Sequence, residues 1–188
     1  MKLWTSQPQE VCDAVLRDGV YHADKNRIPY LDDIPFRNGY DWLVREMEKR
    51  IGPRPEGVTY PVWAWAIYDG EAKAPGDRDS SDNRLLLCID VPDDMVVLSD
   101  YDAWHYVLND WYYDQSLSED EYEEKWARFN RLPLIEQEKE KVLSWQGIFD
   151  TSRVDTEWAI NGFYIQATFW ELRKEHIISI SSRNCPDT

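Results

Sequence analysis

The chain has 188 residues, of which 36 are acidic and 21 basic, so its formal net charge at pH 7 is −15. A negative field of this size disfavours DNA or RNA as a partner, because affinity for their phosphates comes from Lys and Arg side chains that displace counterions. No apolar run approaches the roughly 20 residues that a membrane-spanning helix needs. The length predicts one globular domain over residues 1–188.

The N-terminal segment and the cysteines indicate a reducing compartment. The segment MKLWTSQPQE lacks the apolar core of a signal peptide, so we expect a cytoplasmic location. The cysteines are odd in number, widely spaced and without a CxxC pair, which favours neither a disulfide framework nor a zinc site. They are Cys12, Cys88 and Cys185. The sequence also lacks an HExxH motif and a calcium-loop pattern, and we predict no metal site.

The N-terminal third predicts a strand followed by two helices. The segment KLWT is typical of a short strand, and Val11 and Val15 share one face of a helix that should end at Gly19. A second helix is predicted over residues 39–52, because its apolar side chains recur at helical spacing before a closing glycine.

Alternating segments later in the chain predict a sheet. Residues 61–70, PVWAWAIYDG, carry apolar side chains on both faces, which is typical of a central strand. The segments RLLLCIDVP (84–92) and EWAINGFYIQATFWELRKEHIISIS (157–181) add further strands. Together these elements predict an α+β domain with two small, mainly antiparallel sheets and helices packed on their outer faces.

Residues 99–110, SDYDAWHYVLND, predict a helix that carries one of the three histidines. Ser99 and Asp102 resemble a capping box at its start. Trp104, His105 and Leu108 then fall on one apolar stripe. Two interpretations of His105 stay open: a core histidine with satisfied hydrogen bonds, or a general acid or base that also contacts a ligand.

The next predicted helix, residues 118–130, is strongly acidic. Ser118 and Glu121 match a capping box, and Tyr122, Trp126 and Phe129 form its apolar side. The opposite side carries Glu119, Asp120, Glu123 and Glu124. Such a side is either only solvated or docks on a basic partner.

Ten tryptophans are more than a core of this size ordinarily uses. A buried indole needs a partner for its N–H, so these side chains form either a large aromatic core or a pocket that stacks a planar ligand. Gln166 lies on one face of a predicted central strand. Its amide either bonds neighbouring backbone or faces a cleft.

Five tryptophan-rich or aromatic blocks carry a resemblance to a known family. They are KLWTSQPQEV, GVYHAD, PVWAWAIYDG, LLLCIDVPDDMVVLSDYDAWHYVLN and FYIQATFWELRKEHI. In order and content they resemble domain of unknown function 3841, a bacterial family. The resemblance implies a bacterial or phage protein of one domain and assigns no activity.

The order of the first strand and helix, the strand LLLCIDVPDD and the late strand YIQATFWELRKEHI is also similar to the ADP-ribosyltransferase superfamily. That resemblance implies a split antiparallel sheet that clamps NAD, with a basic residue on the first strand and a glutamate on a late strand. Here Thr5 takes the first place and Gln166 or Glu171 the second. A neutral glutamine stabilises a developing oxocarbenium charge less well than a glutamate, so the resemblance implies lost or altered catalysis.

The leading hypothesis is therefore a cleft, lined by aromatic side chains, that binds NAD or another nucleotide; whether the chain is an enzyme is left open. The candidate catalytic residues are His105, Gln166 and Glu171. The candidate ligand-binding residues are Trp4, Thr5, Gln7, Trp63, Trp65, Asp102, Trp104 and Trp170. The alternative hypothesis is an acidic interaction protein, such as an inhibitor or a nucleic-acid-mimicking decoy, that binds a basic protein surface.

Overall fold

The structure, a computed structural model, describes residues 1–76 and 84–182, so Cys185 lies outside the described residues. The strands are β1 (Lys2–Pro8), β2 (Val20–Tyr21), β3 (Val62–Ile67), β4 (Arg84–Asp90), β5 (Val97–Asp100), β6 (Val154–Asp155), β7 (Ile160–Asn161), β8 (Ile165–Phe169), β9 (Leu172–Arg173) and β10 (Ile177–Ser182). The α-helices are α1 (Gln9–Asp18), α2 (Ile34–Ile51), α3 (Tyr101–Leu108), α4 (Glu119–Phe129) and α5 (Leu134–Ser144). Short 3-10 helices are η1 (Lys25–Arg27), η2 (Asp93–Met95), η3 (Trp145–Phe149) and η4 (Lys174–His176).

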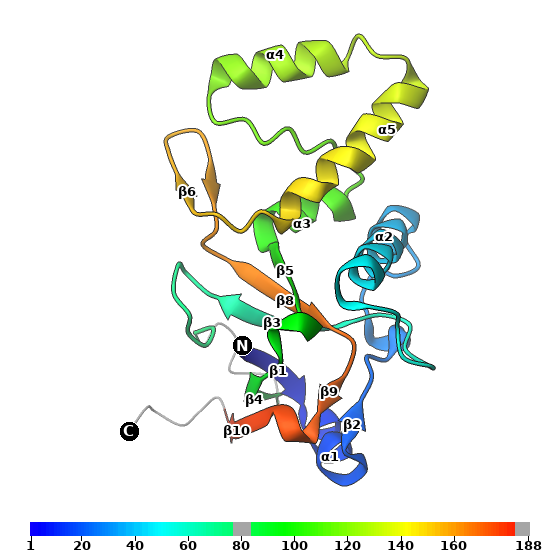
Figure 1. Cartoon of the computed structure of the whole chain (residues 1–188), viewed down its shortest axis with the longest axis vertical. Helices are drawn as coiled ribbons and strands as arrows, with labels where there is room; N and C mark the ends of the chain where they lie inside the picture. The colour runs from blue at the N-terminus through cyan, green and yellow to red at the C-terminus, as the bar shows by residue number, and fades with distance from the viewer. Residues whose placement is uncertain (77–83, 183–188) are drawn as a thin grey trace.

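A six-stranded sheet in the order β10-β4-β1-β3-β8-β5 organises the fold (Figure 1). Each neighbouring pair in it is antiparallel. The predicted α+β class with a mainly antiparallel sheet is confirmed. The strands expected to form two small sheets share this one sheet instead, and the additional pairs β2-β9 and β6-β7 are short. Strand periodicity alone does not specify which strands become neighbours.

Strand β1 pairs to different extents with its two neighbours in the sheet. Strand β1 pairs with β4 along its whole length, from Lys2 opposite Asp90 to Pro8 opposite Arg84. On its other side β1 pairs with β3 through Trp4 and Trp65. The ends of β1 and β3 beyond this pair are therefore not tied by a regular ladder, and the sheet opens between them.

Two apolar clusters cover the sheet. In the first, α1 buries Val11, Cys12 and Val15 against side chains of β1, β3, β4 and β8, and its end at Gly19 in the left-handed conformation is confirmed. The second joins α2, α3 and η3 around the fully buried Leu43, Met47, Val107 and Ile148. In Figure 1, α4 and α5 extend beyond the sheet at the top of the view.

Helix α2 begins at Ile34, five residues before the predicted start. Pro35, which the sequence places in a loop, lies in the first turn of the helix, where a proline is well tolerated because its missing N–H would have no intrahelical partner. Gly39 then allows close packing on α3, since a Cβ atom there would lie 3.2 Å from the backbone oxygen of Val107.

The two predicted helix starts have different outcomes. Ser118 caps α4 by accepting the N–H of Glu121 at 3.3 Å, as predicted. Helix α3 is capped by Asp100 and not by Ser99: the Asp100 carboxylate accepts the N–H groups of Asp102 and Ala103 at 2.9 and 3.0 Å. Asp100 occupies the N-cap position because β5 continues through Ser99 and ends only at Asp100.

The apolar side of α4 is less buried than its pattern predicts. Phe129 is buried and Trp126 half-buried, but Tyr122 is 38% exposed, because α4 lies at the edge of the structure. The acidic residues of the other side, Glu119, Asp120, Glu123 and Glu124, are exposed, as predicted. In the described part of the chain, no helix has both the length and the apolar character to cross a membrane.

Candidate functional site

The opening between β1 and β3 forms a cavity of about 330 Å³, named here the β1–β3 cleft. Its wall comes from the end of β1, the start of β3, the segment around η1, and single residues of α1, β2, α2, β4 and β8. Five of the residues predicted from the sequence meet there. They are Thr5, Gln7, Trp63, Trp65 and Gln166.

Thr5 connects the two sides of the cleft. Its hydroxyl donates a hydrogen bond of 2.7 Å to the backbone oxygen of Trp63, and it accepts one of 2.8 Å from the amide of Gln7. The Thr5 side chain is 2% exposed. The hydroxyl thus replaces a ladder bond at the point where the strands separate, and orients the Gln7 amide.

An aromatic group forms one side of the cleft. Tyr40 of α2 contacts Trp63 edge-on, with ring centroids 6.1 Å apart, and Trp65 continues the wall along β3. Burial, with a smaller contribution from the neighbouring Tyr60, raises the pKa of Tyr40 to about 12. The Tyr40 hydroxyl is therefore neutral at physiological pH and can donate a hydrogen bond.

Two buried polar atoms of this wall have no hydrogen-bond partner among the described residues. They are the indole Nε1 of Trp63 and the amide Oε1 of Gln166. Leaving a buried donor or acceptor unsatisfied costs about 1 to 3 kcal/mol, and native structures hold few such groups. Both residues belong to the wall of the cleft.

Two arginines line the cleft, together with Asp24, which lies 3.8 Å from Arg27. Arg84, at the start of β4, is held by Ser6: its Nη2 donates to the Ser6 carbonyl at 2.5 Å and its Nε to the Ser6 hydroxyl at 3.3 Å. Arg27 donates to Glu10 at 2.9 Å. Neither arginine was predicted from the sequence. The signal available for Arg84 was its place at the first residue of a predicted strand, next to a turn-rich segment.

Three predicted tryptophans belong to the core and not to the cleft. Trp104 is 3% exposed in the cluster around α2 and α3, and Trp170 donates its indole N–H to the carbonyl of Gly52 at 3.2 Å. Trp4 is 9% exposed and contacts Lys2, whose ammonium lies 5.4 Å from the ring centroid. Trp104 does not line the cleft, but its ring packs against Trp63 of the cleft wall, with centroids 5.4 Å apart.

His105 and Asp102 also lie outside the cleft. The Nδ1 atom of His105 is 2.9 Å from the carbonyl oxygen of Tyr101, one helical turn earlier. Because a carbonyl only accepts, Nδ1 carries the proton, and this geometry matches a histidine with a satisfied hydrogen bond. Asp102 lies in the first turn of α3 and lines a different pocket.

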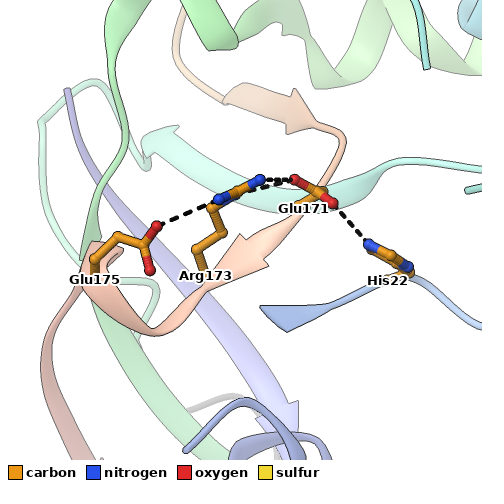
Figure 2. A network of polar contacts seen from close by, with 4 residues as sticks. All are labelled: His22, Glu171, Arg173 and Glu175. Carbon is orange, nitrogen blue, oxygen red and sulfur yellow. Dashed lines mark hydrogen bonds and ion pairs between the residues drawn. The ribbon is translucent and has the colours of Figure 1, made fainter. Parts of the chain in front are cut away.

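Glu171, the third candidate catalytic residue, is the centre of a polar network (Figure 2). Its Oε1 is 2.8 Å from Nε2 of His22, and its Oε2 accepts from Nε and Nη2 of Arg173 at 3.0 and 2.6 Å. Arg173 also reaches Glu175 at 3.5 Å. Burial alone would raise the pKa of Glu171, but the hydrogen bonds from His22 and Arg173 outweigh it and lower the pKa.

This network is connected to the cleft wall through His22. Glu171 does not line the cleft, but His22 directly follows Tyr21, which does. Strand β2 pairs with β9 through Tyr21 and Leu172, so the His22–Glu171 contact extends that short pair by one position. Glu171 therefore positions a wall segment. Within the described ranges, no group of three or more His, Cys, Asp or Glu residues could hold a metal ion.

The fold and the cleft define an α+β protein whose antiparallel sheet opens into a polar, aromatic cavity. The chain belongs to the family described as domain of unknown function (DUF3841), whose sequence model matches residues 2–178. Comparisons with curated proteins and with solved structures found no match. They therefore give no support to the resemblance to ADP-ribosyltransferases.

Proposed function

We propose that the β1–β3 cleft binds a nucleotide-type ligand, with NAD as one member of that class. The observation that carries the proposal is the unpartnered N–H of Trp63 and oxygen of Gln166 in one wall of a cavity that also contains Arg84. A planar base with both donor and acceptor groups would satisfy the two atoms. The cavity volume of about 330 Å³ is at the small end of ligand sites.

Each part of the ligand has a matching part of the cleft. The indoles of Trp63 and Trp65 supply apolar surface for a base. Arg84 and Arg27 supply the positive charge that a phosphate needs, and the planar guanidinium suits bidentate contact. Gln7, whose amide is held by the Thr5 hydroxyl, offers its amide oxygen and remaining N–H to a ribose.

The cleft is proposed as a binding site, and turnover is left open. Asp24 is the carboxylate in its described lining, and that side chain already accepts the backbone and side-chain N–H groups of Asn26, each at 2.9 Å. Gln166 is neutral and cannot act as a base. The groups of the cleft can therefore hold a ligand more readily than they can move a proton.

A thermal-shift titration with AMP, ADP, NAD and adenosine tests the proposal. A ligand that binds only the folded state raises stability by about 2.7 kcal/mol at one hundred times its dissociation constant. We expect a phosphate-bearing member to shift the melting temperature more than adenosine does. The same experiment with Trp63→Phe removes the unpartnered N–H but keeps an aromatic ring, and should weaken binding about tenfold.

Trp126→Phe is the matched control. Trp126, on α4, also has an Nε1 atom without a partner among the described residues, and it does not line the cleft. This variant should leave ligand affinity unchanged. Arg84→Gln should remove the preference for the phosphate-bearing ligand, whereas Arg131→Gln, an exposed arginine after α4, should not. No shift with any of the four ligands would refute the proposal.

A further inference from the structure

A second cavity, of about 290 Å³, lies where α3, residues 113–116, α4 and the β6–β7 segment meet. It is separate from the β1–β3 cleft and shares none of its lining residues. In Figure 1 this region is the upper left of the molecule, where the β6 hairpin lies below α4. We name it the acidic aromatic pocket, after the side chains that form it.

Four aromatic rings come together in this pocket from different elements. Tyr106 and Tyr113 lie with ring centroids 4.9 Å apart, and Tyr122 and Trp158 with centroids 5.7 Å apart. Trp158 is 43% exposed and Tyr122 38% exposed. The faces of such rings attract cations, most strongly when the cation also leaves water.

The charged side chains that line the acidic aromatic pocket are acidic. Asp102 and Asp114 are its ionisable acids, and no Lys, Arg or His is among its described lining residues. Burial raises the pKa of Asp102 and the nearby carboxylate of Asp100 adds to this, whereas His105 acts in the opposite direction. Lys125 is the cationic side chain next to Asp114. Its ammonium is already held by the Asp114 carbonyl at 2.8 Å and by Glu121 at 2.7 Å.

An unpartnered polar side chain also belongs to the wall. Ser116 is 5% exposed, and its hydroxyl has no hydrogen-bond partner among the described residues. Its backbone N–H, in contrast, donates to the Asp114 carboxylate at 2.8 Å, which fixes the loop. A ligand N–H group could use the Ser116 hydroxyl as an acceptor.

We propose that the acidic aromatic pocket binds an organic cation that carries N–H donors, of the guanidinium or primary ammonium class. The two carboxylates accept its N–H groups, the rings pack on its apolar and cationic surface, and Ser116 gains a partner. The exposed acids of α4, next to Tyr122, increase the local concentration of cations. This site goes beyond the nucleotide cleft and is independent of it.

The same chemistry has two sources, a free polyamine or a basic side chain of a protein. Isothermal titration of the whole chain with agmatine and with a short arginine-rich peptide distinguishes them. Tetramethylammonium serves as a cation without N–H groups. We expect agmatine or the peptide to bind at least about tenfold more tightly than tetramethylammonium, because a hydrogen bond to a charged group is worth that much or more.

Matched variants locate the binding. Asp102→Asn should weaken binding about tenfold, whereas Glu124→Gln, the same change of charge on the exposed side of α4, should weaken it less than about twofold. Trp158→Leu should weaken binding about threefold to fivefold. Trp111→Leu, which removes another exposed indole, should leave binding unchanged. A melting temperature for each variant shows that it is folded.

The titrations of these variants either support or overturn the proposal. Binding of agmatine that depends on Asp102 and Trp158 supports a free cation as ligand, and the same dependence with the peptide alone supports a protein side chain. Absence of binding by both probes overturns the proposal. Equal losses in Asp102→Asn and Glu124→Gln also overturn it, because they indicate diffuse attraction to an acidic surface. AMP binding to the β1–β3 cleft should be the same in all four variants.

Discussion

The hydroxyl of Thr5 donates a 2.7 Å hydrogen bond to the backbone oxygen of Trp63, across two strands whose regular pairing is the neighbouring pair Trp4 and Trp65. This single side-chain bond joins β1 to β3 at the inner end of the cleft. It connects the stability of the sheet to the shape of the site, because the same hydroxyl also orients Gln7.

Thr5→Val should therefore affect both stability and ligand binding. Valine has nearly the same shape but leaves the Trp63 carbonyl and the Gln7 amide without this partner. We expect a loss of about 1 to 3 kcal/mol in the free energy of unfolding, measured in urea, and weaker binding of the best nucleotide. The matched variant is Thr168→Val, on β8, where the buried hydroxyl donates to Val97 at 3.3 Å outside the cleft. It should lower stability without changing affinity.

Trp104 and His105 should respond differently to substitution, although they are adjacent. Trp104→Ala removes a core side chain that is 3% exposed and should cost about 3 to 5 kcal/mol. His105→Gln keeps a donor near the Tyr101 carbonyl, so it should cost less than about 1 kcal/mol and leave nucleotide binding unchanged. Urea unfolding and the thermal-shift titration check both. A nearly silent Trp104→Ala would mean that α3 is not packed as described.

The His22–Glu171–Arg173 network predicts a dependence of stability on pH. The pKa of Glu171 is lower in the folded chain than its ordinary value of 4.5, so its ionised form stabilises the fold above that pH. The contribution is lost as the pH falls through the lowered pKa. Glu171→Gln should lower the free energy of unfolding by about 1.5 to 3 kcal/mol at pH 7. The difference in free energy of unfolding between this variant and the parent should shrink below about pH 4.5.

The control for this network is Glu175→Gln. Glu175 is exposed and contacts the same arginine at 3.5 Å. The change of charge is identical, but we expect a much smaller loss of stability at pH 7 than for Glu171→Gln, because exposed ion pairs contribute little. Urea unfolding at pH 7, 5, 4 and 3 measures both variants. Equal effects of the two substitutions would contradict the positioning role of Glu171.

Asp100 should be a stronger helix cap than Ser118. Its carboxylate accepts two N–H groups at the start of α3 and also the N–H of Gly162 at 2.7 Å, and the side chain is 1% exposed. Asp100→Ala should lower the free energy of unfolding by more than about 2 kcal/mol, since two buried donors and one part-buried donor lose their acceptor. Ser118→Ala, which removes an ordinary exposed cap, should cost about 1 kcal/mol. Thermal unfolding compares the two, and a smaller loss for Asp100→Ala would contradict this role.

The sequence by itself determined the local elements. Helix α1 ends at Gly19 and α4 begins after Ser118 because capping depends on the residue at the helix end and its neighbours within one turn. Alternation with period two identified β3 and its Trp63 and Trp65 face. It also placed Gln166 on a strand, but left open whether the amide bonds backbone or faces a cleft.

Only the tertiary structure decided which of these residues share a site. Arg84 reaches Ser6 across 78 positions of sequence, Asp100 reaches Gly162 across 62, and Trp170 reaches Gly52 across 118. A periodic pattern shows which face of an element is apolar, and it carries no information about which other element that face meets. That choice depends on the total burial and hydrogen bonding of the whole chain, which placed Gln166 in the cleft wall, Trp104 and Trp170 in the core, and Trp63 in contact with both.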